Sequence, residues 1–228
     1  MSIYLTGDTH IPIDIRKLNT RNFPEQKTLT DKDYLIVLGD FGLLWHEDRE
    51  YRYWKNWLDT RNFTTLWIDG NHENHTWISS LLVSEWNGGK VHKISDKIIH
   101  LMRGQIFELE GKSFFTFGGA NSIDKGLRVQ GVSWWPEEIP SRKEMEEGFE
   151  NLEKHGWWVD YVLTHTCPKW IVPYMFPKAY LEVDPTGNYL DYISRNAHYQ
   201  HWYFGHWHES KTWNNSFTVL YNDIKRLI

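Results

Sequence analysis

The stretch Tyr34-Leu35-Ile36-Val37-Leu38-Gly39-Asp40-Phe41-Gly42 decides how this chain folds. It begins with a continuous apolar run, which is typical of a strand covered on both faces, and the run stops at a glycine and a carboxylate. The same succession of an apolar run and a short polar loop occurs elsewhere, ending in the segments Gly7-Asp8-Thr9-His10, Gly70-Asn71-His72-Glu73, Thr164-His165-Thr166 and Gly205-His206-Trp207-His208. Because loops that follow neighbouring strands meet at one edge of a sheet, we expect these loops to pool their side chains there.

The composition predicts one globular domain that spans residues 1–228. Apolar residues make up 40% of the chain, which is enough for a sizeable core. No stretch approaches the ~20 apolar residues of a membrane helix, and the chain enters a strand-like run at once, so we expect no signal peptide. The single cysteine, Cys167, excludes an internal disulfide and favours a reducing cytoplasm.

The net charge of −5 argues against a partner made of extended nucleic acid, because proteins that bind many phosphates usually carry a basic stripe. No run along the chain is basic. We expect a phosphorylated small molecule, a nucleotide or a phosphoprotein as the partner, and no membrane. The sequence does not indicate an oligomeric state.

Residues 1–86 alternate strand-like runs with helical patterns, which predicts βαβ units. Residues 90–118 hold short strand patterns separated by turn signals such as Gly104, which favours an antiparallel meander that extends a second sheet. Ser141-Arg142-Lys143-Glu144 is a capping box that opens a helix to about His155.

The acid, imidazole and amide side chains of the polar loops suit a metal site. Asp8 and His10 stand two residues apart, so in extended backbone they point to the same side, and His206 and His208 repeat that spacing. A carboxylate can bridge two ions ~3.5–4 Å apart because its charge offsets their repulsion. Asn71 offers a neutral amide oxygen, which binds a cation without cancelling its charge.

The charge balance of such a site favours an anionic substrate. Two divalent ions outweigh the charges of Asp8 and Asp40, and neutral His and Asn side chains add none. The positive centre attracts a phosphate, and the ions can acidify a bridging water to a hydroxide that attacks phosphorus in line. The leaving alkoxide then needs a proton, and His72 beside Asn71 is the candidate general acid. Glu73 either orients His72 or faces solvent.

In type and order, the polar segments resemble the motifs of the calcineurin-like metallophosphoesterase superfamily, which are Asp-x-His, Gly-Asp, Gly-Asn-His-Asp/Glu, a lone His and Gly-His-x-His. The resemblance implies an α/β fold in which two mixed β-sheets pack as a sandwich flanked by helices. It also implies two divalent metal ions as cofactors, with Mn favoured and Fe, Zn or Mg admissible. It assigns one ion to Asp8, His10, Asp40 and His208, and the other to Asp40, Asn71, His165 and His206, with Asp40 as the bridge.

One departure from the superfamily bears on the substrate. Protein phosphatases usually extend the second motif to Gly-Asp-x-x-Asp-Arg-Gly, whose Arg grips the phosphate, whereas Asp40 is followed here by Phe41-Gly42-Leu43-Leu44-Trp45. We expect the phosphate contact from Arg128, in the long irregular stretch from Gly118 to Pro140, which we predict walls the site. Trp134 in the same stretch is a candidate for stacking on a nucleobase.

These observations predict a metal-dependent hydrolase that cleaves a phosphomonoester or a small phosphodiester with metal-activated hydroxide. Two alternatives stay open, a protein serine/threonine phosphatase and a non-catalytic binding module on the same fold. Such a binding module would be expected to lack ligands or the motif histidine, and every expected position is filled here. Hydrolysis of an aryl phosphate with added manganese would separate the enzyme from the binding module.

Overall fold

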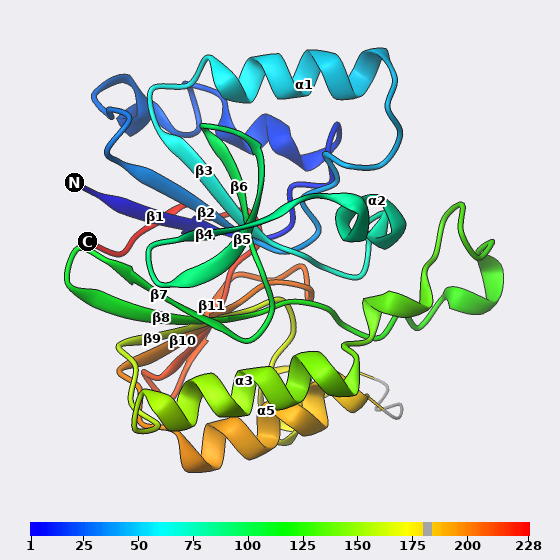
Figure 1. The fold of residues 1–228 in the computed structure, drawn as a ribbon, viewed down its shortest axis with the longest axis vertical. Coiled ribbons are helices and arrows are strands. Elements are labelled where there is room, and N and C mark those ends of the chain that lie inside the picture. The colour runs from blue at the N-terminus through cyan, green and yellow to red at the C-terminus, as the bar shows by residue number, and fades with distance from the viewer. Residues whose placement is uncertain (180–183) are drawn as a thin grey trace.

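The computed structural model describes residues 1–179 and 184–228. Two β-sheets pack face to face, and helices cover the outer face of each sheet (Figure 1). Helix α1 (Arg49–Asp59) lies over the first sheet, while α3 (Arg142–Lys154) and α5 (Pro185–Asn196) run along the second. The predicted α/β fold of two mixed sheets flanked by helices is confirmed.

The first sheet has seven strands in the order β13-β1-β2-β3-β6-β5-β4. Its parallel strands are β1 (Ile3–Thr6), β2 (Tyr34–Leu38), β3 (Thr64–Ile68) and β6 (Ile98–Leu101). Its antiparallel strands are β4 (Val83–Trp86), β5 (Gly89–Ser95) and β13 (Lys225–Arg226).

The second sheet has six strands in the order β11-β12-β10-β9-β8-β7. Its parallel strands are β8 (Lys112–Phe117), β9 (Tyr161–Thr164), β10 (His201–Phe204) and β12 (Phe217–Val219). Antiparallel strands form the two edges, β7 (Gln105–Leu109) and β11 (Lys211–Trp213).

Capping side chains fix where several helices begin. Asp48 accepts a hydrogen bond from the backbone of Tyr51 at the start of α1, and Ser141 and Glu144 form the predicted capping box of α3. Asn74 caps α2 (His75–Ser80). The other short helices are α4 (Val172–Met175) and the 3-10 turns Asp14–Leu18, Pro24–Lys27, Lys125–Leu127, Pro136–Glu138 and Lys169–Ile171. Within the described part of the chain, no helix has the length and apolar character needed to cross a membrane.

An apolar layer between the sheets holds the sandwich together. Ile36 and Leu66 of the first sheet belong to the same buried cluster as Phe114 and Leu163 of the second. The register of the parallel strands is level, with Leu38 opposite Ile68. The loops that follow these strands therefore emerge side by side at one edge of the sandwich.

The predicted meander of residues 90–118 is wrong in its sheet assignment. Its strands form, but β5 and β6 complete the first sheet, whereas β7 and β8 belong to the second. The chain crosses between the sheets at Arg103-Gly104, where Gly104 has a left-handed φ of 72°. A Cβ on Gly104 would come within 2.8 Å of the Cα of Gly148 in α3, so only glycine fits this crossing.

Candidate metal centre

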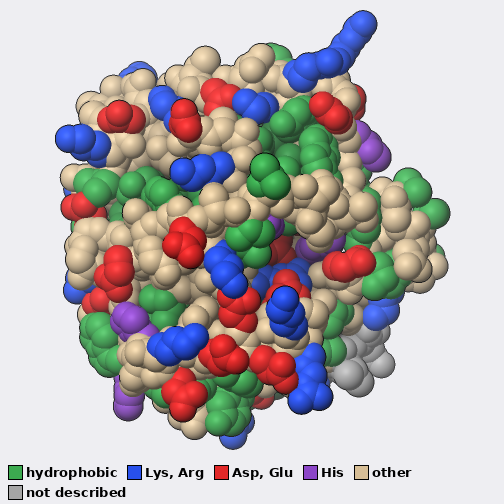
Figure 2. Space-filling view, viewed as in Figure 1, with side chains coloured by type: hydrophobic (Ala, Val, Ile, Leu, Met, Phe, Trp, Pro, Cys, Tyr) green, Lys and Arg blue, Asp and Glu red, His purple; other side chains and the backbone are tan. Residues whose placement is uncertain are grey.

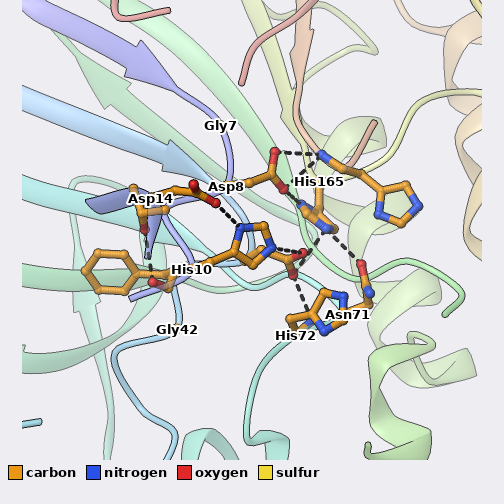
Figure 3. Close-up of polar contacts among 12 residues, drawn as sticks. Gly7, Asp8, His10, Asp14, Gly42, Asn71, His72 and His165 are labelled. Carbon is orange, nitrogen blue, oxygen red and sulfur yellow. Dashed lines mark hydrogen bonds and ion pairs between the residues drawn. The ribbon is translucent and has the colours of Figure 1, made fainter. Parts of the chain in front are cut away.

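The polar loops of both sheets meet at one edge of the sandwich (Figure 3). Asp8, Asp40 and Asn71 follow β1, β2 and β3 of the first sheet. His165 follows β9 of the second sheet, and the segment with His206 and His208 follows β10. The backbone N–H of His206 donates to both carboxylate oxygens of Asp8, at 3.0 and 3.1 Å, so the two sheets are joined directly at the site.

One half of the site is a cluster of four side chains. One ligand atom from each of Asp8, His10, Asp40 and His208 lies within 4.8 Å of all the others. Both carboxylates are buried, at 0% exposure for Asp8 and 1% for Asp40. The Nε2 atom of His10 lies 3.3 Å from Oδ2 of Asp40.

The other half of the site lies on the opposite side of Asp40. Its Oδ1 atom is 3.3 Å from Nε2 of His165, and the same nitrogen lies 3.0 Å from Oδ1 of Asn71. The His206 ring stands at 5.0 Å from the His165 ring. The two oxygens of Asp40 therefore face different groups of candidate ligand atoms, an arrangement that suits a bridging carboxylate.

Burial and close charges shift the pKa values of these groups in opposite directions. Burial raises the pKa of Asp8 to about 7. Burial alone would lower the pKa of His165, but the charge and hydrogen bond of Asp40 raise it to about 9. The pKa of His10 also rises to about 9, against its burial, through its hydrogen bond to Asp40. Two buried carboxylates among nitrogen and amide-oxygen donors fit a divalent cation. Its positive charge offsets the cost of burying two negative charges.

The expectation of extended backbone from Asp8 to His10 is wrong. His10 has a left-handed φ of 34°, and Asp40, His206 and His208 are also left-handed, at 47°, 66° and 49°. The loops turn sharply because they pair with each other rather than continuing the sheet; for example, His10 N–H donates to the carbonyl of Asp40 at 2.8 Å. The side chains of Asp8 and His10 still converge, through this turn and not through strand alternation.

Close packing at Gly70 fixes the approach of two loops. A Cβ there would lie 2.0 Å from Oδ1 of Asp40, which no side chain could tolerate. The backbone N–H of His72 then donates to the same oxygen at 2.7 Å. Glycine before Asn71 therefore lets the third motif loop close on the bridging carboxylate.

His72 and Arg128 meet at the rim of the site. The Nη2 atom of Arg128 lies 3.4 Å from Nε2 of His72. Asp124 holds the guanidinium through two oxygens, at 2.8 and 2.7 Å. Burial lowers the pKa of His72, and the charge of Arg128 adds to this against the opposing charge of Asp40.

Glu73 neither orients His72 nor faces solvent, the two roles expected from the sequence. It is fully buried, and its oxygens accept hydrogen bonds from the backbone of Phe41 at 2.6 Å and of Gly42 at 3.3 Å. Burial raises its pKa to about 8. Glu73 therefore holds the second motif loop against the third.

Two contacts around the ligands carry no sequence signal. Asp14 Oδ2 lies 2.8 Å from Nδ1 of His10 and accepts a hydrogen bond from the hydroxyl of Tyr221 at 3.1 Å. The Tyr221 ring stacks on His208 at 4.6 Å. Asp14 and Tyr221 are 207 residues apart, so no local spacing could reveal that together they hold two predicted ligands.

Two cavities open beside the cluster. The larger, about 820 Å³, is bordered by Asp40, Asn71, His206 and His208. The smaller, about 310 Å³, is bordered by His10 and Arg128, and His72 borders both. Residues 118–140 include a lobe that projects from the body (Figure 1), and Figure 2 shows acidic, basic and imidazole side chains in a recess beside it.

The structure does not bring Trp134 to either of these cavities. Its neighbour Trp135 is buried and packs edge-on against Trp45 at 5.2 Å. Trp45 borders the smaller cavity, and Trp207 and Phe176 border the larger one. The aromatic surface beside the site therefore comes from residues other than Trp134.

Comparisons with known proteins identify the family of the chain. A search of curated proteins found no match. Among solved structures, phosphopantetheinyl hydrolase from Mycobacterium tuberculosis is similar, with 17% sequence identity, a TM-score of 0.46, and coverage of 97% of this chain and 90% of that chain. The family model described as calcineurin-like phosphoesterase matches residues 1–210. The chain therefore belongs to the calcineurin-like phosphoesterase family and is a metal-dependent phosphoester hydrolase.

Proposed function

We propose that this enzyme hydrolyses a phosphomonoester or a small phosphodiester at two divalent ions that share Asp40. The observation that carries the proposal is that Oδ2 of Asp40 faces His10 while its Oδ1 faces His165. The proposed ligands are Asp8, His10, Asp40 and His208 for one ion, and Asp40, Asn71, His165 and His206 for the other. Mn is our first choice for both ions, because the donor set lacks sulfur and admits hard-to-borderline cations.

Bound divalent ions supply Lewis-acid stabilisation of phosphate oxygens and lower the pKa of a water molecule. The chain itself contributes positioning and proton transfer. Asp8 and Asp40 are held by backbone N–H groups of His206 and His72, so neither carboxylate is free to rotate away. This fixed geometry is suited to stabilising charge that develops on a phosphate.

We assign His72 as the general acid and Arg128 as the phosphate contact. Both border the smaller cavity, and His72 also borders the larger one, where it could reach a leaving-group oxygen. Burial lowers the pKa of His72. A bound phosphate brings negative charge beside the ring, which favours its protonated form during turnover.

The larger cavity supports a small substrate with an organic leaving group. Its volume of about 820 Å³ suits a small-molecule site, and part of its wall is apolar, formed by Met175, Phe176 and Trp207. Lys178 also borders the cavity and is exposed. A cation at this position would suit a substrate with a second negative charge, such as a nucleotide.

The test is hydrolysis of an aryl phosphate monoester and an aryl phosphodiester by protein reconstituted with Mn²⁺. Fe²⁺, Zn²⁺ and Mg²⁺ are compared in the same assay to rank the metals. A phosphoserine peptide tests the protein-phosphatase alternative. No turnover of any of these phosphoesters with any of the four metals would contradict the proposal.

Replacing Asp40 with Asn is expected to lower metal content and to reduce hydrolysis to background. The variant loses the charge that lies between the two halves of the site, while its shape is kept. Elemental analysis measures the ions, and Asp31→Asn, at an exposed position, is the matched control. Two tightly held ions in the Asp40→Asn protein would overturn the bridging assignment.

A further inference from the structure

An asparagine ligand poses a problem that a carboxylate ligand does not. The two ends of its amide have the same shape, but only the oxygen can bind a cation, since the NH₂ group is a donor. The orientation of a buried Asn amide at a metal site must therefore be fixed by its other hydrogen bonds. Asn71 is 5% exposed, and its Oδ1 lies 3.0 Å from Nε2 of His165, on the side of the predicted ligands.

A chain of buried polar groups leads away from the other end of that amide. Nδ2 of Asn71 donates to the hydroxyl of Ser122 at 3.1 Å. The Ser122 hydroxyl donates in turn to Oε2 of Glu138 at 2.5 Å, and the Ser122 backbone N–H donates to Oε1 of the same carboxylate at 2.9 Å. Ser122 is 3% exposed and Glu138 is fully buried.

We propose that Ser122 and Glu138 are positioning residues that make Asn71 present its oxygen to the metal site. An ionised carboxylate can only accept hydrogen bonds, so Glu138 takes the single hydroxyl proton of Ser122. The Ser122 oxygen is then left as an acceptor, and it is satisfied by the NH₂ end of Asn71. The direction of the whole chain follows from the charge of Glu138. The inference rests on the proposed function, since it takes Asn71 as a ligand.

This role gives the stretch of residues 118–140 a second contact with the site. Both positioning residues lie in that stretch, and Ser122 is 51 residues from Asn71 in sequence. Arg103 anchors the same stretch by donating to the carbonyl of Glu137 at 2.9 Å. The stretch therefore reaches the site in two ways, through Arg128 at the rim and through Ser122 behind a ligand.

Two substitutions separate hydrogen-bond direction from packing. Ser122→Ala removes the acceptor and leaves the amide of Asn71 free to face either way. Glu138→Gln keeps the shape of the side chain but reverses the direction of the hydrogen bonds from Glu138 to Asn71. The Gln oxygen must face the Ser122 N–H, so its NH₂ donates to the Ser122 hydroxyl. The hydroxyl proton then lacks its carboxylate acceptor, and bonding instead to the Asn71 oxygen would turn that oxygen away from the site. The isosteric variant should therefore be the more harmful of the two.

The experiment is calorimetric titration of metal-free protein with Mn²⁺ at pH 8. Burial raises the pKa of Glu138 from its ordinary value, so an alkaline pH favours its ionised carboxylate. We expect Ser122→Ala to lower the affinity for the ion on the Asn71 side by about 10–100-fold, the usual cost of losing a residue that orients a metal ligand. Glu138→Gln should weaken it further. The other ion should bind as in the parent protein.

Ser133→Ala, in the same stretch, is the control, because the Ser133 hydroxyl accepts from the nearby backbone N–H of Val129. Thermal unfolding of the metal-free variants checks that they fold. If Glu138→Gln does not fold, Ser122→Ala alone decides the inference.

Asn71→Ala separates failure of the inference from failure of the proposed function. If Asn71→Ala binds both ions normally, the ligand assignment itself is wrong. If Asn71→Ala loses affinity while Ser122→Ala matches the parent protein, the positioning role is overturned and the proposed function stands. Affinity for Glu138→Gln equal to that of the parent would overturn the argument from hydrogen-bond direction.

Discussion

Asp40 is the residue on which the contacts of the site converge. Its two oxygens face His10 and His165 at 3.3 Å each, and one of them also accepts from the backbone of His72. Burial would raise the pKa of Asp40, but the charge of His165 holds it well below its usual range. A carboxylate held ionised and immobile in this way is suited to binding cations rather than to carrying protons.

His72→Ala should keep the metal content but slow turnover by about 10²–10⁴-fold, as expected on removal of a general acid. The loss should be largest for alkyl phosphates, because their alkoxide leaves poorly without a proton. Rates are compared for alkyl and activated aryl esters, with the exposed His155→Ala as control. If both kinds of ester slow equally, His72 only positions the substrate.

Arg128→Ala should lower kcat/KM without removing metal. Nε and Nη2 of the guanidinium donate to Asp124, which holds Nη2 beside His72, where its positive charge can attract a phosphate. Steady-state kinetics and elemental analysis measure the two effects, and the exposed Arg142→Ala serves as control. Kinetics identical to those of the parent protein for several phosphoesters would assign Arg128 to the structure of its own loop.

The sequence indicated which candidate ligands meet at one edge of the sandwich, but not the residues that surround them. Each predicted ligand follows an apolar run, and the strand ends alone place Asp8, Asp40 and Asn71 near each other. Ser122 and Tyr221 could not be found in this way, because their roles depend on contacts between distant segments. Trp134 borders neither cavity for a related reason, since the sequence marks an aromatic residue but not the direction in which its loop turns it.

At the scale of elements, the crossing between β6 and β7 shows where local patterns stop being informative. Short strand patterns and turn signals predicted the strands in residues 90–118, but such local patterns do not determine which strand each one pairs with. At the crossing, Arg103 and Gly104 contact segments far away in sequence, and local patterns cannot reveal such contacts.

Arg103→Met should destabilise the protein by about 3–5 kcal/mol, the usual cost of leaving one partner of a buried ion pair unpaired. Arg103 donates to Oδ2 of Asp69 through Nε at 2.8 Å and Nη2 at 2.5 Å, and both residues are buried. Its charge holds the pKa of Asp69 well below its ordinary value, against the effect of burial. Urea unfolding measures the change.

The exposed Arg142→Met is the control for this substitution. Arg103→Met should also weaken catalysis, since Asp69 directly precedes Gly70 and the third motif loop. A loss of stability below about 1 kcal/mol, typical of an exposed ion pair, would show that His100, whose Nε2 lies 3.2 Å from Oδ1 of Asp69, compensates for the lost guanidinium.

At the scale of the whole molecule, the site is shared between the two sheets. Asp8, Asp40 and Asn71 come from the first sheet, and His165 and His206 come from the second. The apolar layer between the sheets thus sets the distance between ligands as well as the stability of the fold. Neither sheet could bind the proposed pair of ions alone.

Asp160 joins distant segments of the second sheet and makes the stability depend on pH. It accepts from the backbone of Ser113 at 2.9 Å, from Lys112 at 2.9 Å and from Gln200 at 2.6 Å. Burial opposes its ionisation, but the hydrogen bonds from Ser113 and Lys112 and the charge of Lys112 together lower the pKa of Asp160. Its contribution is therefore present above the ordinary carboxyl pKa of 3.8 and is lost as the pH falls through the lowered folded value.

Asp160→Asn should cost about 1–2 kcal/mol at pH 7, within the range for a buried hydrogen-bonded group. The difference from the parent protein should shrink below pH 4, as the parent carboxylate takes up its proton. Urea unfolding from pH 7 to pH 3 measures this, with the exposed Asp31→Asn as control. A difference that stays constant over this range would show that the charge of Asp160 contributes nothing.

The left-handed backbone at His10, Asp40, His206 and His208 bears on which amino acids the site can be made from. Most residues avoid this conformation, which costs roughly 1–2 kcal/mol for an L-residue, but Asp, Asn and His adopt it more readily than other non-glycine residues. The same few residue types also bind divalent cations. The residue types allowed at these positions are therefore restricted twice, once by the need to bind a cation and once by the left-handed turn. A glutamate or cysteine placed at one of these positions would satisfy the first demand and fail the second.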